Sequence, residues 1–118
     1  AMLPEAHREP YSVTYIGENT LGHDILGGAL QADYRQGDHS YTLYLFLHDS
    51  APQNHQMVRD YFRLCGKETE PSSSGTAALN DPYNGRVYAG WKETHTWLVT
   101  GLTPGQQELA FKILEEGM

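Results

Sequence analysis

The stretch SYTLYLFLHDS, residues 40–50, carries the strongest strand signal in the chain. In an extended strand successive side chains point to opposite faces of the sheet. The apolar residues here fall into two such sets, Leu43, Leu45 and Leu47 on one face and Tyr44 and Phe46 on the other. Apolar residues on both sides favour a central strand that is covered, at least in part, on both faces. We therefore expect a sheet with helices packed against it.

A helix is expected directly after this strand. Ser50 can cap its N-terminus, and Pro52 falls in the first turn, where a missing N–H costs little. Gly66 suits the left-handed residue that ends many helices. The apolar stripe of this helix consists of Met57, Val58, Tyr61, Phe62 and Cys65.

The residues before the central strand predict a short strand and then a helix. YSVTYI, residues 11–16, alternates and is rich in β-branched and aromatic side chains. In GENTLGHDILGGALQADY, residues 17–34, the apolar residues keep the spacing of one helical stripe. They are Leu21, Ile25, Leu26, Ala29, Leu30 and Tyr34.

Two glycines stand in the middle of that expected helix. Each mid-helix glycine costs about 1 kcal/mol relative to alanine, so we expect Gly27 and Gly28 to allow a close approach of another element, or a kink. Gly22 and Gly27 have the spacing of a phosphate-binding P-loop, but Gly28 and Ala29 follow where lysine and Ser/Thr are required. The stretch therefore predicts packing and not nucleotide binding.

The second half of the chain predicts a loop, a hairpin and a final helix. Residues 67–85, KETEPSSSGTAALNDPYNG, have the composition of a mobile loop or an insertion. RVYAGWK (86–92) and TWLVTGL (96–102) predict a β-hairpin around residues 93–95. Thr103 and Gln106 have the T-x-x-Q spacing of a capping box. The apolar residues of the helix that follows are Leu109, Ala110, Ile113 and Leu114.

These elements follow one another as β-α-β-α-loop-β-β-α. That order, in a chain of 118 residues, predicts a single α+β domain over residues 1–118. We expect an antiparallel or mixed sheet of about four strands with helices packed on it.

Composition excludes several classes of partner. Fifteen acidic against eight basic residues give a net charge of −7, and the basic residues are scattered along the chain. Phosphate backbones and anionic membrane surfaces require clustered cations, so we expect no nucleic-acid partner. No run approaches the roughly 18 apolar residues of a membrane span. Cys65 is the only cysteine and cannot form an internal disulfide.

Residues that could carry chemistry do not form a recognisable motif. His39, His48 and His55 are too widely spaced for a zinc motif, which places ligands two to five residues apart, so we expect no metal and no cofactor. Cys65 falls on an apolar stripe, where burial raises the pKa of a thiol. Ser72 and its serine neighbours lack the glycines of a nucleophile elbow. The sequence predicts no catalytic residue.

Aromatic residues are the most suggestive remaining feature. Those on expected strands are Tyr11, Tyr15, Tyr41, Tyr44, Tyr88, Trp91 and Trp97. A three-residue turn over 93–95 would place Trp91 opposite Trp97 on one face, and a two-residue turn would separate them. If buried they belong to the core, which is the usual place of strand aromatics. If exposed, Tyr44, Trp91 and Trp97 are our candidate binding residues, since Tyr and Trp dominate binding hot spots.

Part of the chain resembles a bacterial extracytoplasmic family, often lipoproteins, catalogued as a domain of unknown function. Its members run roughly Gly-Glu-Asn-Leu and then Ile-Asn-Gly-Gly-Ala-Glu, and the matching positions here are Gly17, Glu18, Asn19, Leu21, Ile25, Gly27, Gly28 and Ala29. Leu26 and Leu30 depart from the pattern. The resemblance implies a periplasmic or extracellular location, with a lipid anchor in the full-length precursor, and brings no catalytic residues. The hairpin and last helix also resemble the end of anti-sigma-factor sensor domains.

Three functional hypotheses follow. The first is a non-catalytic extracytoplasmic domain that binds a protein, a peptide or a small ligand through its sheet face or loops. The second is an enzyme whose site assembles from distant residues, such as His48 and Asp49 with a carboxylate from residues 67–85. The third is a structural, assembly or sensor module.

Overall fold

The chain is described here by a computed structural model that covers residues 3–118, and β3 (His39–Leu47) lies in the interior of its sheet. Leu43 and Leu45 are buried against one helix, and Phe46 is buried against the other. The expected central strand, covered on both faces, is thus confirmed. Leu47, at the end of the strand, is about half exposed.

Within residues 3–118 the sheet has six strands in the order β1-β2-β3-β6-β5-β4, and every neighbouring pair is antiparallel. The strands besides β3 are β1 (Thr14–Ile16), β2 (Ala29–Gln36), β4 (Gly75–Asp81), β5 (Gly85–Lys92) and β6 (His95–Thr100). The α+β class and the antiparallel sheet are confirmed, whereas the expected number of four strands is wrong.

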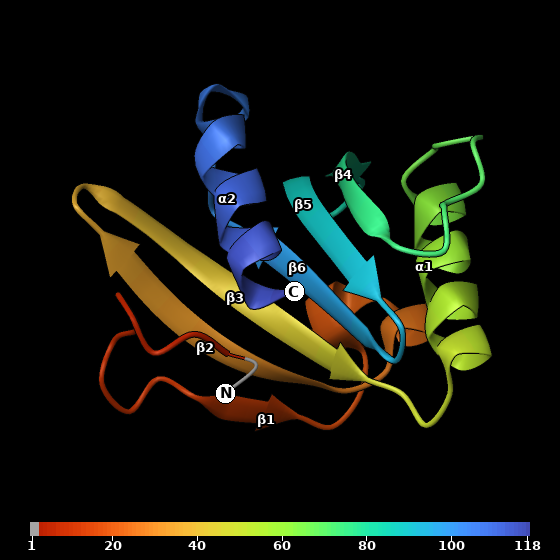
Figure 1. Cartoon of the computed structure of the whole chain (residues 1–118), viewed down its shortest axis with the longest axis horizontal. Coiled ribbons are helices and arrows are strands. Elements are labelled where there is room, and N and C mark those ends of the chain that lie inside the picture. The colour runs from red at the N-terminus through yellow and green to blue at the C-terminus, as the bar shows by residue number, and fades with distance from the viewer. Residues whose placement is uncertain (1–2) are drawn as a thin grey trace.

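Two helices cover opposite faces of the sheet. They are α1 (Ala51–Leu64) and α2 (Gln107–Gly117), and Figure 1 shows α2 crossing the near face while α1 lies at one end. Alternation along β6 separates the two cores, because Trp97 and Val99 pack with α2 while Leu98 packs with α1. Within residues 3–118, no helix combines the length and apolar content that a membrane crossing requires.

Helix α1 begins and ends as expected. The Ser50 hydroxyl accepts a hydrogen bond from the backbone N–H of Gln53 at 3.3 Å, and Pro52 lies in the first turn. Gly66, with φ of 77°, follows the helix end. The buried residues of the helix include Met57, Val58, Tyr61 and Phe62, so the apolar stripe read from the sequence faces the core.

The helix expected over residues 17–34 is wrong. The chain forms two short 3-10 turns, η1 (Thr20–Gly22) and η2 (Asp24–Leu26), and then enters β2. Left-handed backbone at Asn19, Leu21 and Gly22 interrupts any helix. Leu30, Ala32 and Tyr34 are every second residue of β2 and lie on one face of it. Leu30 and Tyr34 are four residues apart, a spacing that also fits one face of a helix.

The two central glycines of this segment have different roles. A Cβ atom on Gly28 would lie 2.7 Å from the carbonyl oxygen of Ile16 and 2.8 Å from that of Gly17, so the expected close approach is confirmed here, against the end of β1. Gly27 has nothing within 4 Å of its Cβ position, but its φ is 59°. Its carbonyl accepts hydrogen bonds from both the backbone N–H and the hydroxyl of Thr20.

The expectation that residues 67–85 form a loop throughout is also wrong. Residues 75–81 form β4, which pairs with β5 along its whole length. Its alternate side chains Ala77 and Leu79 face the core under α1. The irregular parts are residues 65–74, before the strand, and the turn at residues 82–84 that leads into β5.

The end of the chain matches the prediction closely. The hairpin β5–β6 turns at Glu93 and Thr94, and the backbone N–H of Thr103 donates to Gln106 Oε1 at 2.8 Å, half of a capping box. A 3-10 turn, η3 (Pro104–Gln106), precedes α2, whose buried residues are Ala110, Ile113 and Leu114.

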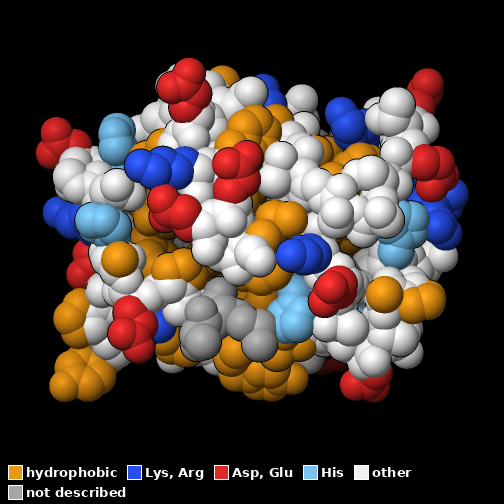
Figure 2. Space-filling view, in the orientation of Figure 1, with side chains coloured by type: hydrophobic (Ala, Val, Ile, Leu, Met, Phe, Trp, Pro, Cys, Tyr) orange, Lys and Arg blue, Asp and Glu red, His pale blue; other side chains and the backbone are white. Residues whose placement is uncertain are grey.

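The aromatic residues expected on strands divide between core and surface, although Tyr11 lies before β1 and not on a strand. Tyr41, Tyr88, Trp91 and Trp97 are buried, Tyr44 is half-buried, and Tyr11 and Tyr15 are exposed. Figure 2 shows hydrophobic side chains on the surface along the sheet edge where β1 lies.

Candidate functional site

The structure places the two tryptophans in the core, on opposite faces of the sheet. Gly90 pairs with Trp97 and Trp91 pairs with Thr96, which is the register of the two-residue turn. Trp91 is 3% exposed and Trp97 is 4% exposed, so neither offers a free surface. Tyr44 lies on the same face as Trp91, half-buried, and burial raises the pKa of its hydroxyl. The three candidate residues do not come together in one patch.

Trp91 nevertheless positions a surface feature. Its indole N–H donates to the carbonyl oxygen of Ser72 at 2.8 Å, and its ring meets Phe62 of α1 edge to face, with centroids 5.4 Å apart. A buried indole N–H needs such a partner. The bond holds the irregular segment before β4 against the sheet.

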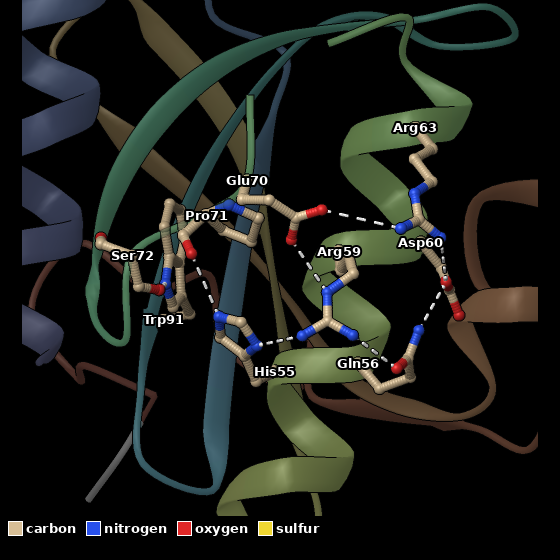
Figure 3. A network of polar contacts seen from close by, with 9 residues as sticks. All are labelled: His55, Gln56, Arg59, Asp60, Arg63, Glu70, Pro71, Ser72 and Trp91. Atoms are coloured by element: carbon tan, nitrogen blue, oxygen red, sulfur yellow. Dashed lines mark hydrogen bonds and ion pairs between the residues drawn. The ribbon is translucent and has the colours of Figure 1, made fainter. Parts of the chain in front are cut away.

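His55 of α1 holds the same segment from the other side (Figure 3). Its Nε2 donates to the carbonyl oxygen of Pro71 at 3.1 Å, while its Nδ1 accepts from the Arg59 guanidinium at 3.1 Å. Because Nδ1 accepts, the proton must be on Nε2. Arg59 in turn donates to Glu70 at 3.0 Å, so residues 70–72 are tied to α1 at two points.

The outer part of this network is more exposed. Arg59 donates to Gln56 at 2.8 Å, Gln56 donates to Asp60 at 2.8 Å, and Arg63 lies 3.6 Å from Glu70. Exposed ion pairs contribute about 0–1 kcal/mol each. These contacts therefore orient side chains along α1 more than they stabilise the fold.

Asn54 is the buried neighbour of His55 in α1. It is 1% exposed, and its amide donates to the carbonyl oxygens of Glu93 and His95 at 3.0 and 2.9 Å. Its Oδ1 accepts from the Thr96 hydroxyl at 2.6 Å. Asn54 thus fixes the start of α1 to the tip of the β5–β6 hairpin.

Between these fixed parts lies an open groove of about 500 Å³, which we call the α1 groove. Its lining residues are Ala51, Pro52, Asn54, His55, Pro71, Ser73 and Glu93. Glu93 is exposed and takes part in none of the ion pairs within residues 3–118. The groove therefore combines small apolar surfaces with one unpaired carboxylate.

A buried polar cluster lies elsewhere, where η1–η2, α1 and the β4–β5 turn meet. His23 Nε2 donates to Asp81 at 2.8 Å, and the Tyr61 hydroxyl donates to the same carboxylate at 2.6 Å. The backbone N–H groups of Tyr83 and Asn84 also donate to it. Although burial alone would raise the pKa of Asp81, the hydrogen bonds from Tyr61, His23, Tyr83 and Asn84 lower it.

The contacts of this cluster are those of a structural element that joins segments, not of a reactive site. The side chains of His23 and Asp81 are 3% and 0% exposed, so no substrate reaches them. Burial raises the pKa of the Tyr61 hydroxyl, and it raises that of Cys65 to about 11, so both keep their protons at neutral pH. Sequence reasoning missed the cluster because its members belong to segments expected to be a helix and a loop.

The assembled enzyme site of the second hypothesis has no counterpart among hydrogen bonds within residues 3–118. His48 is half-buried, its Nε2 is buried without a partner, and burial lowers its pKa. The two carboxylates of the 67–85 segment with side-chain partners, Glu70 and Asp81, bind Arg59 and His23 instead. No three His, Cys, Asp or Glu side chains in this part of the chain cluster as metal ligands would.

No protein-family model matches the chain, and neither a curated protein nor a solved structure is similar enough to match it.

Proposed function

We propose that this chain is a non-catalytic binding domain whose α1 groove takes an extended peptide segment carrying a basic residue. The main support for the proposal is that hydrogen bonds hold the floor and walls of the α1 groove in place before a ligand binds. Asn54 holds the carbonyls of Glu93 and His95, and His55 and Trp91 hold those of Pro71 and Ser72. A preorganised site loses less conformational entropy on binding than a mobile one.

The chemistry of the lining selects the class of ligand. Ala51, Pro52 and Pro71 offer small apolar surfaces without deep aromatic pockets, which suits small side chains of an extended chain. Glu93 supplies an unpaired negative charge at one side, in a chain of net charge −7. Complementary charge raises the association rate and favours one partner over another, so the ligand should place Lys or Arg beside Glu93.

The proposal that the chain is non-catalytic is supported by the contacts and burial of its reactive side chains. His23 and Tyr61 both donate to Asp81 in the core, and burial keeps Cys65 protonated. A periplasmic or extracellular location is also part of this proposal, and it rests on the family resemblance of residues 17–29.

Selection from a random peptide display library tests the proposal. We expect enriched peptides with a Lys or Arg among small residues that bind the wild-type chain and lose binding to Ser73→Trp, which fills the groove. Ser74→Trp is the matched control, since Ser74 is exposed in the same segment but does not line the groove. Enrichment that Ser73→Trp leaves unchanged, or turnover of a substrate by the purified chain, would contradict the proposal.

A further inference from the structure

A second hollow lies on the opposite face of the sheet, between α2, the segment at residues 4–7 and the β2–β3 hairpin. It encloses about 170 Å³, and we call it the α2 cavity. Figure 2 shows basic, acidic and histidine side chains gathered beside α2 on this face. Its charged lining residues are His7, Lys112 and Glu116.

Two tyrosines form the inner wall of the α2 cavity. Tyr34 and Tyr41 are directly opposite on β2 and β3, and their rings stack with centroids 5.3 Å apart at 3°. The Tyr34 hydroxyl donates to the carbonyl oxygen of Pro4 at 2.7 Å, which holds the N-terminal segment as the outer wall. Burial raises the pKa of Tyr34 to about 12, so this donor keeps its proton.

The hydroxyl of Tyr41 is not used in this way. Tyr41 is 5% exposed, it lines the cavity, and its hydroxyl has no hydrogen-bond partner among residues 3–118. Glu116 lines the same cavity, and burial and then the charge of Glu116 raise the pKa of Tyr41. A polar ligand in the cavity could form a hydrogen bond with the Tyr41 hydroxyl.

Lys112 and Glu116 present opposite charges to the cavity without neutralising each other. They are four residues apart on α2, about 6 Å along the helix axis, and neither occurs in the ion pairs of residues 3–118. Lysine preceding glutamate is the less favourable order for a helical ion pair. His7 lines the same cavity from the N-terminal segment. Its backbone carbonyl accepts a hydrogen bond from the backbone N–H of Arg35 at 2.8 Å, which holds the segment against β2.

We propose that the α2 cavity binds a small zwitterion of the free α-amino acid class. The carboxylate of the ligand binds Lys112, its ammonium group binds Glu116, and one of its polar atoms forms a hydrogen bond with the Tyr41 hydroxyl. The volume equals that of about six molecules of liquid water and is below the roughly 300 Å³ at which drug-sized ligand pockets begin. A single amino acid therefore fits better than a nucleotide or a longer peptide.

Calorimetric titration of the chain with each of the twenty free amino acids tests this proposal. We expect at least one amino acid to bind with one-to-one stoichiometry. Its N-acetyl derivative, which lacks the ammonium group, and its amide, which lacks the carboxylate, should each bind at least about tenfold more weakly, since each loses a charge-assisted hydrogen bond. Equal binding of either derivative would overturn the assignment to zwitterions.

Variants locate the binding to the cavity. Lys112→Met and Glu116→Gln should each reduce affinity at least about tenfold, and Tyr41→Phe should reduce it several-fold. Both charged residues are exposed on α2, so the variants should keep the wild-type circular dichroism. Lys92→Met and Glu115→Gln are matched controls at exposed positions outside the cavity.

Two results would overturn the inference. One is the absence of heat with every amino acid at about 10 mM, a concentration that fills most of a site with a Kd of about 1 mM. The other is binding that survives both Lys112→Met and Glu116→Gln. Ser73→Trp, on the opposite face, should leave amino-acid binding unchanged, so failure of the peptide proposal is distinguishable from failure of this one.

Discussion

Asn54→Ala should destabilise the protein out of proportion to the size of the change. Asn54 is 1% exposed and makes three hydrogen bonds, two to carbonyl oxygens at the hairpin tip and one from the Thr96 hydroxyl. Alanine keeps the helix but removes all three. It leaves Thr96, itself 2% exposed, without an acceptor for its hydroxyl.

The magnitude follows from counting these bonds. Each intramolecular hydrogen bond contributes about 1 kcal/mol net, and an unsatisfied buried group costs about 1–3 kcal/mol. We expect Asn54→Ala to lower the free energy of unfolding by about 3 kcal/mol, a large part of the roughly 5–15 kcal/mol of a typical domain. For a chain of this length the melting temperature should fall by roughly 12 °C.

Urea unfolding of five proteins, the wild type and four variants, measures this effect. Thr96→Val removes the partner of Asn54 Oδ1, so the double variant Asn54→Ala/Thr96→Val should cost about 1 kcal/mol less than the sum of the single variants. Asn80→Ala, at an exposed asparagine, should stay within about 0.5 kcal/mol of the wild type. Strict additivity, or a cost for Asn54→Ala no larger than that of Asn80→Ala, would refute the role of this network.

Three further changes test the fold. Gly28→Ala should cost about 1–3 kcal/mol in urea unfolding, because its Cβ would lie 2.7 Å from the Ile16 carbonyl oxygen, whereas Gly105→Ala, with 3.8 Å to its nearest neighbour, should cost little. Asp81 has a lowered pKa when folded, so its contribution is present above about pH 4 and is lost as the pH falls through the folded pKa. Asp81→Asn should therefore be destabilised at pH 7 and show a weaker loss of stability below pH 4 in acid titration by circular dichroism; an unchanged acid transition contradicts this. His48 also has a lowered pKa, so protonation favours the unfolded chain and stability falls as the pH drops below about 6.5. His48→Gln should lose less stability than the wild type between pH 8 and pH 5, and equal losses would count against it.

Elements with local signals could be predicted from the sequence. Helix α1 has its own cap, proline and apolar stripe, and β3 has apolar residues on both faces. The local sequence of each is therefore enough to predict it. The β5–β6 hairpin and α2 were likewise visible from alternation, turn length and the Thr103–Gln106 spacing. In each case the local preference and the tertiary environment agree.

The segment 29–36 could not be assigned by periodicity alone. Leu30 and Tyr34 are four residues apart, which suits one face of a helix and equally one face of a strand. Pairing with β3 decides between the two. Gly37 and Asp38, directly before the strong strand, form a turn dipeptide. Such a dipeptide before a strand indicates a β-hairpin and therefore a strand, not a helix, over residues 29–36.

Strand β4 has a weak signal for a different reason. Ala77 and Ala78 bury little surface, and its one large buried apolar residue is Leu79. The strand exists because β5 supplies a partner along its whole length. Residues 82–84 form the turn between the two strands, and Gly85, the first residue of β5, adopts φ of 75° directly after it.

Both proposed sites share one feature of construction. An irregular segment forms one wall of each hollow, and a polar atom of a buried aromatic residue donates to a backbone carbonyl of that segment. Trp91 bonds Ser72 beside the α1 groove, and Tyr34 bonds Pro4 beside the α2 cavity. The anchored carbonyls lie 19 and 30 residues from their aromatic partners, so no local pattern contains the contact. Trp91 and Tyr34 therefore fix the position of a wall of each hollow through contacts with residues far away in the sequence.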